Sequence, residues 1–451
     1  MSVKVALGWV AVGSMVLVSC SDSDAPPLQA SVVTSEVASK LPTSTTVAPP
    51  TSVATPPTTP APDPCRVAPP LPPVPTETAP AALVAAVGDA LFAPRWGALD
   101  VSGLVWVEGY GVVGSRAPDA ALLPASNQKL FTAIGAHLLL AGDRRFTTEV
   151  RRIGSTLVLR AGGDPTLTTA GPHSLDALAD QVRGAVGRGP VRVVVDAGYF
   201  EAATMAAGWQ DWHVPTYVGP MSALIVDDNR IRADADYVSD PARGNGERFA
   251  DRLRRVGVAV DGPVEWRRDA DGSGGTVVAR LDSAPVDELL GDMLRRSDNE
   301  IAESLLREIG GGSTADGVGR IDTALGGWCL GLTGTSGDGS GLSRDDFRSA
   351  GEWVRLLQAA STQPWGDDLL AALPVAGRSG TLAGRLGGLG TAGNVWAKTG
   401  TIIGGQALSG YARTISGRAV VFSVIVNGEP GAVDGVTSAL DGVVVAAVRN
   451  G

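Results

Sequence analysis

Residues 124–133 read Pro-Ala-Ser-Asn-Gln-Lys-Leu-Phe-Thr-Ala, so a serine, Ser126, stands three positions before a lysine, Lys129. The apolar residues that follow have helical spacing, and we expect a helix that begins near Ala125. Side chains three positions apart lie on one face of a helix, so both can point at one site. A neighbouring base can take the serine proton and make the hydroxyl nucleophilic.

Lysine is rare in this chain. Only Lys4, Lys40, Lys129 and Lys398 occur, although lysine and arginine together number 37. A guanidinium keeps its proton in proteins, whereas a buried ammonium can lose it. To act as a base, Lys129 needs a pKa lowered from about 10.4 toward 7, which costs about 4 kcal/mol. Burial and a second nearby cation are the effects that we expect to supply this shift.

A second motif, Ser297-Asp298-Asn299, falls between two helical runs, where we expect a short exposed turn. The Ser297 hydroxyl can relay a proton, and the Asn299 amide offers both a donor and an acceptor to a peptide. The same residue types also cap helices, and capping and catalysis are compatible here.

The third motif, Lys398-Thr399-Gly400-Thr401, follows a predicted strand. We expect Lys398, Thr399 and Thr401 to bind a carboxylate together, because the two hydroxyls alternate along the strand. Gly400 is expected to leave room for a ligand beside the backbone. The structural alternative is a strand end with an ordinary glycine turn.

In this order the three motifs are the signature of penicillin-recognising serine enzymes. The length of the stretch between the first two motifs distinguishes the subfamilies of these enzymes, and in this chain the stretch is long. The chain resembles the D-alanyl-D-alanine carboxypeptidase/endopeptidase family, the class C low-molecular-mass penicillin-binding proteins, which insert extra domain material there. The resemblance covers roughly residues 81–451. It is carried by residues 124–133, 162–167, 338–343, 380–382 and 393–395, as well as by the motifs.

The resemblance implies an α/β (α+β) fold. We expect a transpeptidase domain of the penicillin-binding-protein/β-lactamase type, with an antiparallel sheet flanked by helices, interrupted by a nested β-rich module. Residues 81–144 and 280–451 are assigned to the peptidase domain, and residues 145–279 to the module. The insertion looks shorter than in relatives with two nested domains. Strand-like runs occur at 104–107, 156–159, 191–195, 394–401, 407–413 and 418–427.

The resemblance also implies a mechanism. Ser126 would attack the penultimate D-Ala carbonyl of a peptidoglycan stem peptide, Lys129 would accept its proton, and Ser297 would pass a proton to the leaving D-Ala. Asn299 would orient the peptide, and residues 398–401 would bind its carboxylate. Backbone N–H groups of Ser126 and Thr401 would form the oxyanion hole. β-Lactams would inhibit by the same route. The alternatives are a β-lactamase and a catalytically inactive cell-wall-binding lipoprotein.

The N-terminal residues predict export. Residues 1–19 read as a signal peptide that ends in Leu17-Val18-Ser19-Cys20, which resembles the lipobox of bacterial lipoproteins. Lipidation of Cys20 would anchor the protein to the outer face of the cell membrane. Residues 20–80 are rich in Pro, Thr and Ser and predict a disordered tether. If Cys20 is lipidated, Cys65 and Cys329 remain as a possible disulfide.

Other classes of function find little support. The net charge of -10 and the absence of basic runs argue against nucleic acid. We interpret His137, His173 and His213 as structural, and residues 227–229 (Asp-Asp-Asn) as a polar turn after a strand at 223–226. No sequence motif for a metal or cofactor is present, so we propose neither.

Overall fold

The computed structural model describes residues 65, 69, 75–186, 190–231, 237–268 and 274–451. The expected signal peptide (1–19), Cys20 and most of the expected tether (20–80) lie outside the described residues. All described residues belong to one unit, residues 61–451. None of the helices in this described part is both long enough and apolar enough to cross a membrane.

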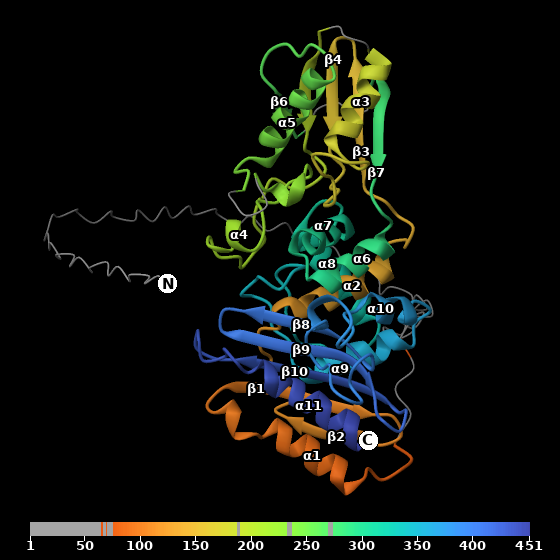
Figure 1. Ribbon diagram of the computed structural model, residues 1–451, viewed down its shortest axis with the longest axis vertical. Helices are drawn as coiled ribbons and strands as arrows, with labels where there is room; N and C mark the ends of the chain where they lie inside the picture. Colours follow the sequence, from red (N-terminus) through yellow and green to blue (C-terminus); the bar gives the residue numbers. More distant parts are fainter. Residues whose placement is uncertain (1–64, 66–68, 70–74, 187–189, 232–236, 269–273) are drawn as a thin grey trace, which may run out of the picture. The chain divides into compact units, whose positions relative to one another are not determined.

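The part of the chain expected to form the peptidase domain is built on an antiparallel sheet with the strand order β2-β1-β10-β9-β8 (Figure 1). Its strands are β1 (Asp100–Val107), β2 (Gly111–Arg116), β8 (Val395–Ile402), β9 (Gly405–Arg413) and β10 (Ala419–Asn427). The central strand β10 is almost continuously apolar, which is typical of a strand covered on both faces. The strands predicted in this domain are confirmed.

Helices cover both faces of this sheet. Helices α1 (Ala81–Leu91) and α11 (Thr437–Asn450) lie side by side on one face, so the two ends of the folded chain meet (Figure 1). In α1 the fully buried residues are Leu83, Val87 and Leu91, which share one helix face. The remaining helices of the domain are α2 (Gln128–Leu139), α6 (Val286–Arg296), α7 (Asn299–Ile309), α8 (Thr314–Gly326), α9 (Ala350–Ser361) and α10 (Gly366–Ala372). This arrangement confirms the expected fold class.

The inserted module has a second five-stranded sheet, in the order β6-β5-β4-β3-β7. Its strands are β3 (Thr147–Ile153), β4 (Thr156–Arg160), β5 (Arg192–Asp196), β6 (Glu265–Arg267) and β7 (Thr276–Asp282), and its helices are α3 (Leu175–Val186), α4 (His213–Thr216) and α5 (Pro241–Arg255). The sheet is mixed, because β4 and β6 pair with β5 in parallel. The module therefore combines a mixed five-stranded sheet with helices.

Two details of the module differ from the sequence expectations. Strand β7 pairs with β3 up to the pair of Thr147 and Asp282, so the expected boundary at residue 279 falls inside a strand and the module ends after Asp282. Residues 223–226 form no strand, although they are buried. Burial alone explains why this apolar run resembles a strand in the sequence.

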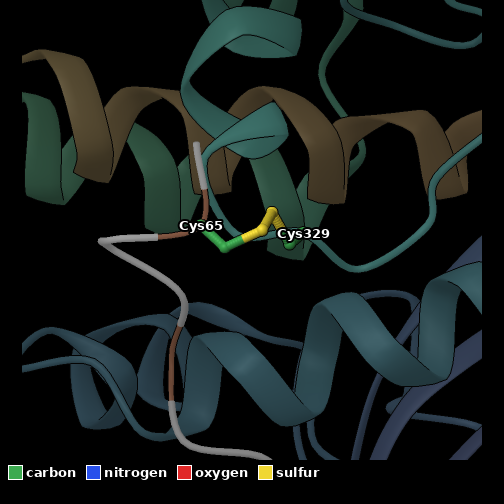
Figure 2. Close-up of a disulfide and its surroundings, with 2 residues drawn as sticks. All are labelled: Cys65 and Cys329. Carbon is green, nitrogen blue, oxygen red and sulfur yellow. A yellow bond between two sulfur atoms is a disulfide. The ribbon is translucent and has the colours of Figure 1, made fainter. Parts of the chain in front are cut away.

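A disulfide links the segment before the first helix to the peptidase domain. Figure 2 shows Cys65 joined to Cys329, which follows α8. The two residues are 264 positions apart in sequence, and their Cα atoms lie 5.5 Å apart. The bond fixes the end of the expected tether to the peptidase domain, which is consistent with an oxidising compartment.

Candidate active site

Ser126 lies on a tight turn that leads into α2. It occupies the 3-10 turn η2 (Ala125–Asn127), directly before Gln128, the first residue of α2. Ala125 is buried and has a φ of 47°, a left-handed conformation that costs a residue with a side chain about 1–3 kcal/mol. A Cβ atom at Gly341 would collide with the Ala125 carbonyl. The surrounding chain therefore holds the turn in place and leaves Ser126 partly exposed.

Lys129 is fully buried and is held by three acceptors. Its Nζ lies 3.2 Å from the Ser126 Oγ and donates to the Asn299 Oδ1 at 2.6 Å and to the Ser340 carbonyl oxygen at 2.6 Å. The Ser126–Lys129 pair predicted from the first motif is therefore in contact. The Asn299 amide, from the second motif, accepts a further hydrogen bond from the same amine. Asn299 is itself fixed, because its Nδ2 donates to the carbonyl oxygen of Tyr217 at 2.9 Å.

Burial lowers the pKa of Lys129 from 10.5 to about 8. Four carboxylates, led by Asp338 and Asp298, oppose this shift by stabilising the charged form. The expected contribution of a second cation is not among the causes. Instead, Lys129 affects Lys398. Burial is the main reason that the pKa of Lys398 lies well below its ordinary value, and the charge of Lys129 lowers it further.

Ser297 and Lys398 form a second contact in the same site. The fully buried Lys398 Nζ donates to the Ser297 Oγ at 2.9 Å and to the carbonyl oxygen of Thr399 at 2.7 Å. Ser297 ends α6 in a left-handed conformation with a φ of 61°. The capping role falls to Asp298, whose Oδ1 accepts the Ile301 N–H at 2.9 Å. The Ser297 hydroxyl is thus not used to cap α7 and accepts a hydrogen bond from Lys398.

The remaining residues of the third motif are arranged differently from expectation. A Cβ at Gly400 would lie 2.8 Å from the carbonyl oxygen of Pro124, so the space beside Gly400 is filled by the turn that carries Ser126. The expectation that this space serves a ligand is wrong in that respect. Thr399 is buried and its hydroxyl donates to that of Thr381 at 2.8 Å, whereas Thr401 is exposed.

The loop at residues 338–343 supports Lys129. The sequence pointed to this loop only through the family resemblance. The Asp338 carboxylate accepts from the backbone N–H groups of Gly341 (2.8 Å) and Leu342 (3.2 Å), and from the indole of Trp209 (2.6 Å). These bonds shape the loop that presents the Ser340 carbonyl to Lys129. The dense run Asp-Gly-Ser-Gly is the only sequence signal for this role.

The histidines lie elsewhere. His137 stacks on Trp365 with ring centroids 4.8 Å apart, His173 contacts the Asp164 carboxylate at 2.6 Å, and His213 is fully buried. Within the described part of the chain, none of them bonds to the Ser126 hydroxyl. Each has a packing or polar contact that fits a structural role.

The polar residues 227–229 form the turn η3 (Asp227–Asn229), in which all three have positive φ. The Asp227 carboxylate accepts the backbone N–H of Thr169 at 2.9 Å. Across the described ranges, no cluster of His, Cys, Asp and Glu side chains has the arrangement needed to hold a metal ion.

The fold and this constellation define a class of protein. A serine that starts a helix, a lysine one turn later, a Ser-Asp-Asn turn and a Lys-Thr-Gly strand surround one site on a helix-flanked antiparallel sheet. That combination is the hallmark of the penicillin-recognising serine enzymes.

The chain belongs to the D-Ala-D-Ala carboxypeptidase 3 (S13) family, a family of serine peptidases, whose profile matches residues 109–238 and 236–447. It is 34% identical to carboxypeptidase DacB of Mycolicibacterium smegmatis over 347 residues, which cover 70% of this chain and 72% of the relative. It is 32% identical to the D-alanyl-D-alanine carboxypeptidase of Actinomadura sp. strain R39, covering 70% of this chain and 75% of the relative.

Solved structures share the fold. Penicillin-binding protein 4 of Haemophilus influenzae matches with a TM-score of 0.69 and 20% identity, over 80% of this chain and 97% of that protein. That relative has also been solved in complex with a β-lactam. The match to the family profile and the identity to the two curated relatives confirm the family expected from the three motifs.

The lowered pKa of Lys129 predicts a pH dependence. The neutral amine is the form that can accept the Ser126 proton, and it accumulates as the pH rises through about 8. We therefore expect kcat/KM for D-Ala release from a D-Ala-D-Ala peptide to rise with pH and to level off above that value. Steady-state rates across this range measure it. A profile that is flat through pH 8 would contradict the assignment of the base.

Asp338 offers a second test. Asp338→Asn weakens the loop that holds the Ser340 carbonyl, so we expect kcat/KM to fall by roughly 10²-fold. Asp338 also raises the pKa of Lys129, so the midpoint of the pH profile should move to lower pH. Asp345→Asn, at an exposed position in the same loop, is the matched control. Equal effects of the two variants, or an unchanged midpoint of the pH profile, would contradict the role of Asp338 in supporting Lys129.

Proposed function

We propose that this protein is an exported D,D-carboxypeptidase that removes the terminal D-Ala of peptidoglycan stem peptides through an acyl-enzyme on Ser126. The observation that carries the proposal is the 3.2 Å contact between the Ser126 Oγ and a buried Lys129 amine of lowered pKa. A crosslink whose acyl donor is D-Ala presents the same bond, so D,D-endopeptidase activity belongs to the same proposal.

Acylation would begin with neutral Lys129. Its Nζ accepts the Ser126 proton while the Oγ attacks the carbonyl carbon of the penultimate D-Ala. The tetrahedral oxyanion would be stabilised by backbone N–H groups of Ser126 and Thr401. Collapse breaks the peptide bond, and the leaving D-Ala amine takes a proton through the Ser297 hydroxyl. Water then attacks the ester and releases the shortened peptide.

Lys398, Thr399 and Thr401 would bind the terminal carboxylate of the peptide. In the free enzyme, burial holds the pKa of Lys398 well below its ordinary value. A substrate carboxylate beside the amine would favour its charged form. Gly400 contributes by letting the Ser126 turn approach the strand. In the free enzyme Asn299 already holds Lys129, so its contact with the peptide would be additional.

We also propose that the protein acts outside the cytoplasm and is anchored through lipid on Cys20. The support is the lipobox-like sequence ending at Cys20, the Pro- and Thr-rich run after it, and the family's D-Ala-D-Ala substrates, which belong to the cell wall. The Cys65–Cys329 disulfide suits an oxidising compartment. A tether between the anchor and the peptidase domain would let the site work away from the membrane surface.

The experiment that tests the catalytic proposal uses a fluorescent penicillin. A β-lactam ring should open on Ser126 and remain attached as a slowly hydrolysed ester. We expect a one-to-one adduct by intact mass in the wild type and no adduct in Ser126→Ala. Lys129→Arg keeps the charge but cannot serve as a base, so its acylation rate should drop by about 10²–10⁴-fold.

The other outcomes separate the alternatives. Rapid turnover of the drug without an accumulated adduct would identify a β-lactamase. Neither adduct nor turnover in a folded sample would favour a catalytically inactive cell-wall-binding protein. Lys129→Met, tested beside Lys129→Arg, separates loss of the base from poor accommodation of the larger guanidinium, because both variants should fail to acylate if the base is what matters.

A further inference from the structure

The open face of the module sheet forms one wall of a cavity of about 650 Å³, which we call the module cavity. The opposite face of the sheet is covered by α3 and α5, and it carries the buried side chains of Val150, Leu159 and Val195. The second wall comes from the peptidase domain and includes Glu308, near the end of α7. The proposed reaction uses no residue of this cavity.

Charged side chains form a row across the sheet. Arg280 on β7 lies opposite Glu149 on β3, Glu149 lies opposite Arg160 on β4, and Arg160 lies beside Asp196 on β5. Arginine and carboxylate thus alternate along one face. Ion pairs join two of these three neighbouring pairs, with 3.2 Å between Arg280 and Glu149 and 3.6 Å between Arg160 and Asp196. The side chains of the row remain partly exposed.

The described lining carries an excess of positive charge. Six arginines stand against three carboxylates, although the chain as a whole has a net charge of -10. The arginines are Arg144, Arg145, Arg151, Arg160, Arg268 and Arg280. The guanidinium fork matches carboxylate and phosphate groups in a bidentate geometry. A positive cavity in an acidic protein concentrates anionic ligands at that place.

The mixture of charges favours a peptide over a pure polyanion. Glu149 and Asp196 within the row would repel a continuous phosphate chain, whereas they suit a ligand that carries an amine among its carboxylates. A stem peptide that retains its free carboxylates and one amine has this composition. A cavity of this volume is in the range that holds a ligand of a few residues.

We propose that the module cavity binds a second peptidoglycan stem peptide, separate from the one that reacts at Ser126. This inference rests on the proposed function, because the same polymer would supply both peptides. Asn299 and Glu308 are nine residues apart on α7, so the site and the cavity wall are separated by about 14 Å along the helix. Binding at the cavity would hold the enzyme on the wall and raise the local concentration of reactive ends.

The test titrates the soluble tetrapeptide N-acetyl-L-Ala-γ-D-Glu-L-Lys-D-Ala, which keeps one amine, into protein whose active site has first been acylated with benzylpenicillin. Intact mass verifies the adduct before any peptide is added. Calorimetry should show binding to the blocked wild type, roughly tenfold weaker binding to Arg160→Gln and to Arg280→Gln, and no binding of the carboxyl-amidated peptide. Arg255→Gln removes the same charge from an exposed position on α5 and should bind within about twofold of the wild type.

Failure of the catalytic proposal can be distinguished from failure of the cavity proposal. A missing penicillin adduct counts against the catalytic proposal, and the comparison of Arg160→Gln with Arg255→Gln still tests the cavity. Equal binding by these two variants, or no binding by the folded wild type, would overturn the proposal. Tighter binding of poly(glycerol phosphate) than of the peptide, lost in Arg160→Gln, would assign the cavity to a phosphate polymer and would also overturn it.

Discussion

The buried amine of Lys129 is the interaction on which the rest of the site depends. Three elements that are distant in the sequence meet at its Nζ: the turn of Ser126, the start of α7 at Asn299, and the loop that ends in the Ser340 carbonyl. Moving any of them would leave a buried polar group without a partner, which costs about 1–3 kcal/mol. The proposed catalysis would therefore depend on the packing of the domain around Lys129.

Desolvation explains why the chain keeps lysine here. A fall in the pKa of Lys129 from 10.5 to about 8 corresponds to about 3 kcal/mol of lost charge stabilisation. Arginine would keep its charge at the same cost in burial and would give no base. Burial also holds the pKa of Lys398, beside Ser297, well below its ordinary value. Both lysines of the described chain thus lie in the candidate site.

Part of this arrangement could be predicted from the sequence. The spacing of Ser126 and Lys129 placed both on one helix face, and the apolar runs predicted individual strands, because these signals are local. The helix-flanked antiparallel sheet was implied by the family resemblance. The support from the Ser340 carbonyl could not be predicted, since a backbone acceptor leaves no residue-type signal. The same holds for Gly400, whose missing side chain accommodates Pro124 rather than a ligand. The mixed pairing of the module sheet also depends on tertiary contacts.

The most direct test of the central claim is the pKa of Lys129 itself. Four lysines in the whole chain make this measurement simple: protein labelled with ¹³C at the lysine Cε gives few signals, and Lys129→Met assigns the one of interest. The account predicts a signal that titrates near pH 8, well below the ordinary lysine value of about 10.4, and that is absent from the variant. If every lysine titrated near that ordinary value, Lys129 would be a charged structural residue, and the account of catalysis would be wrong.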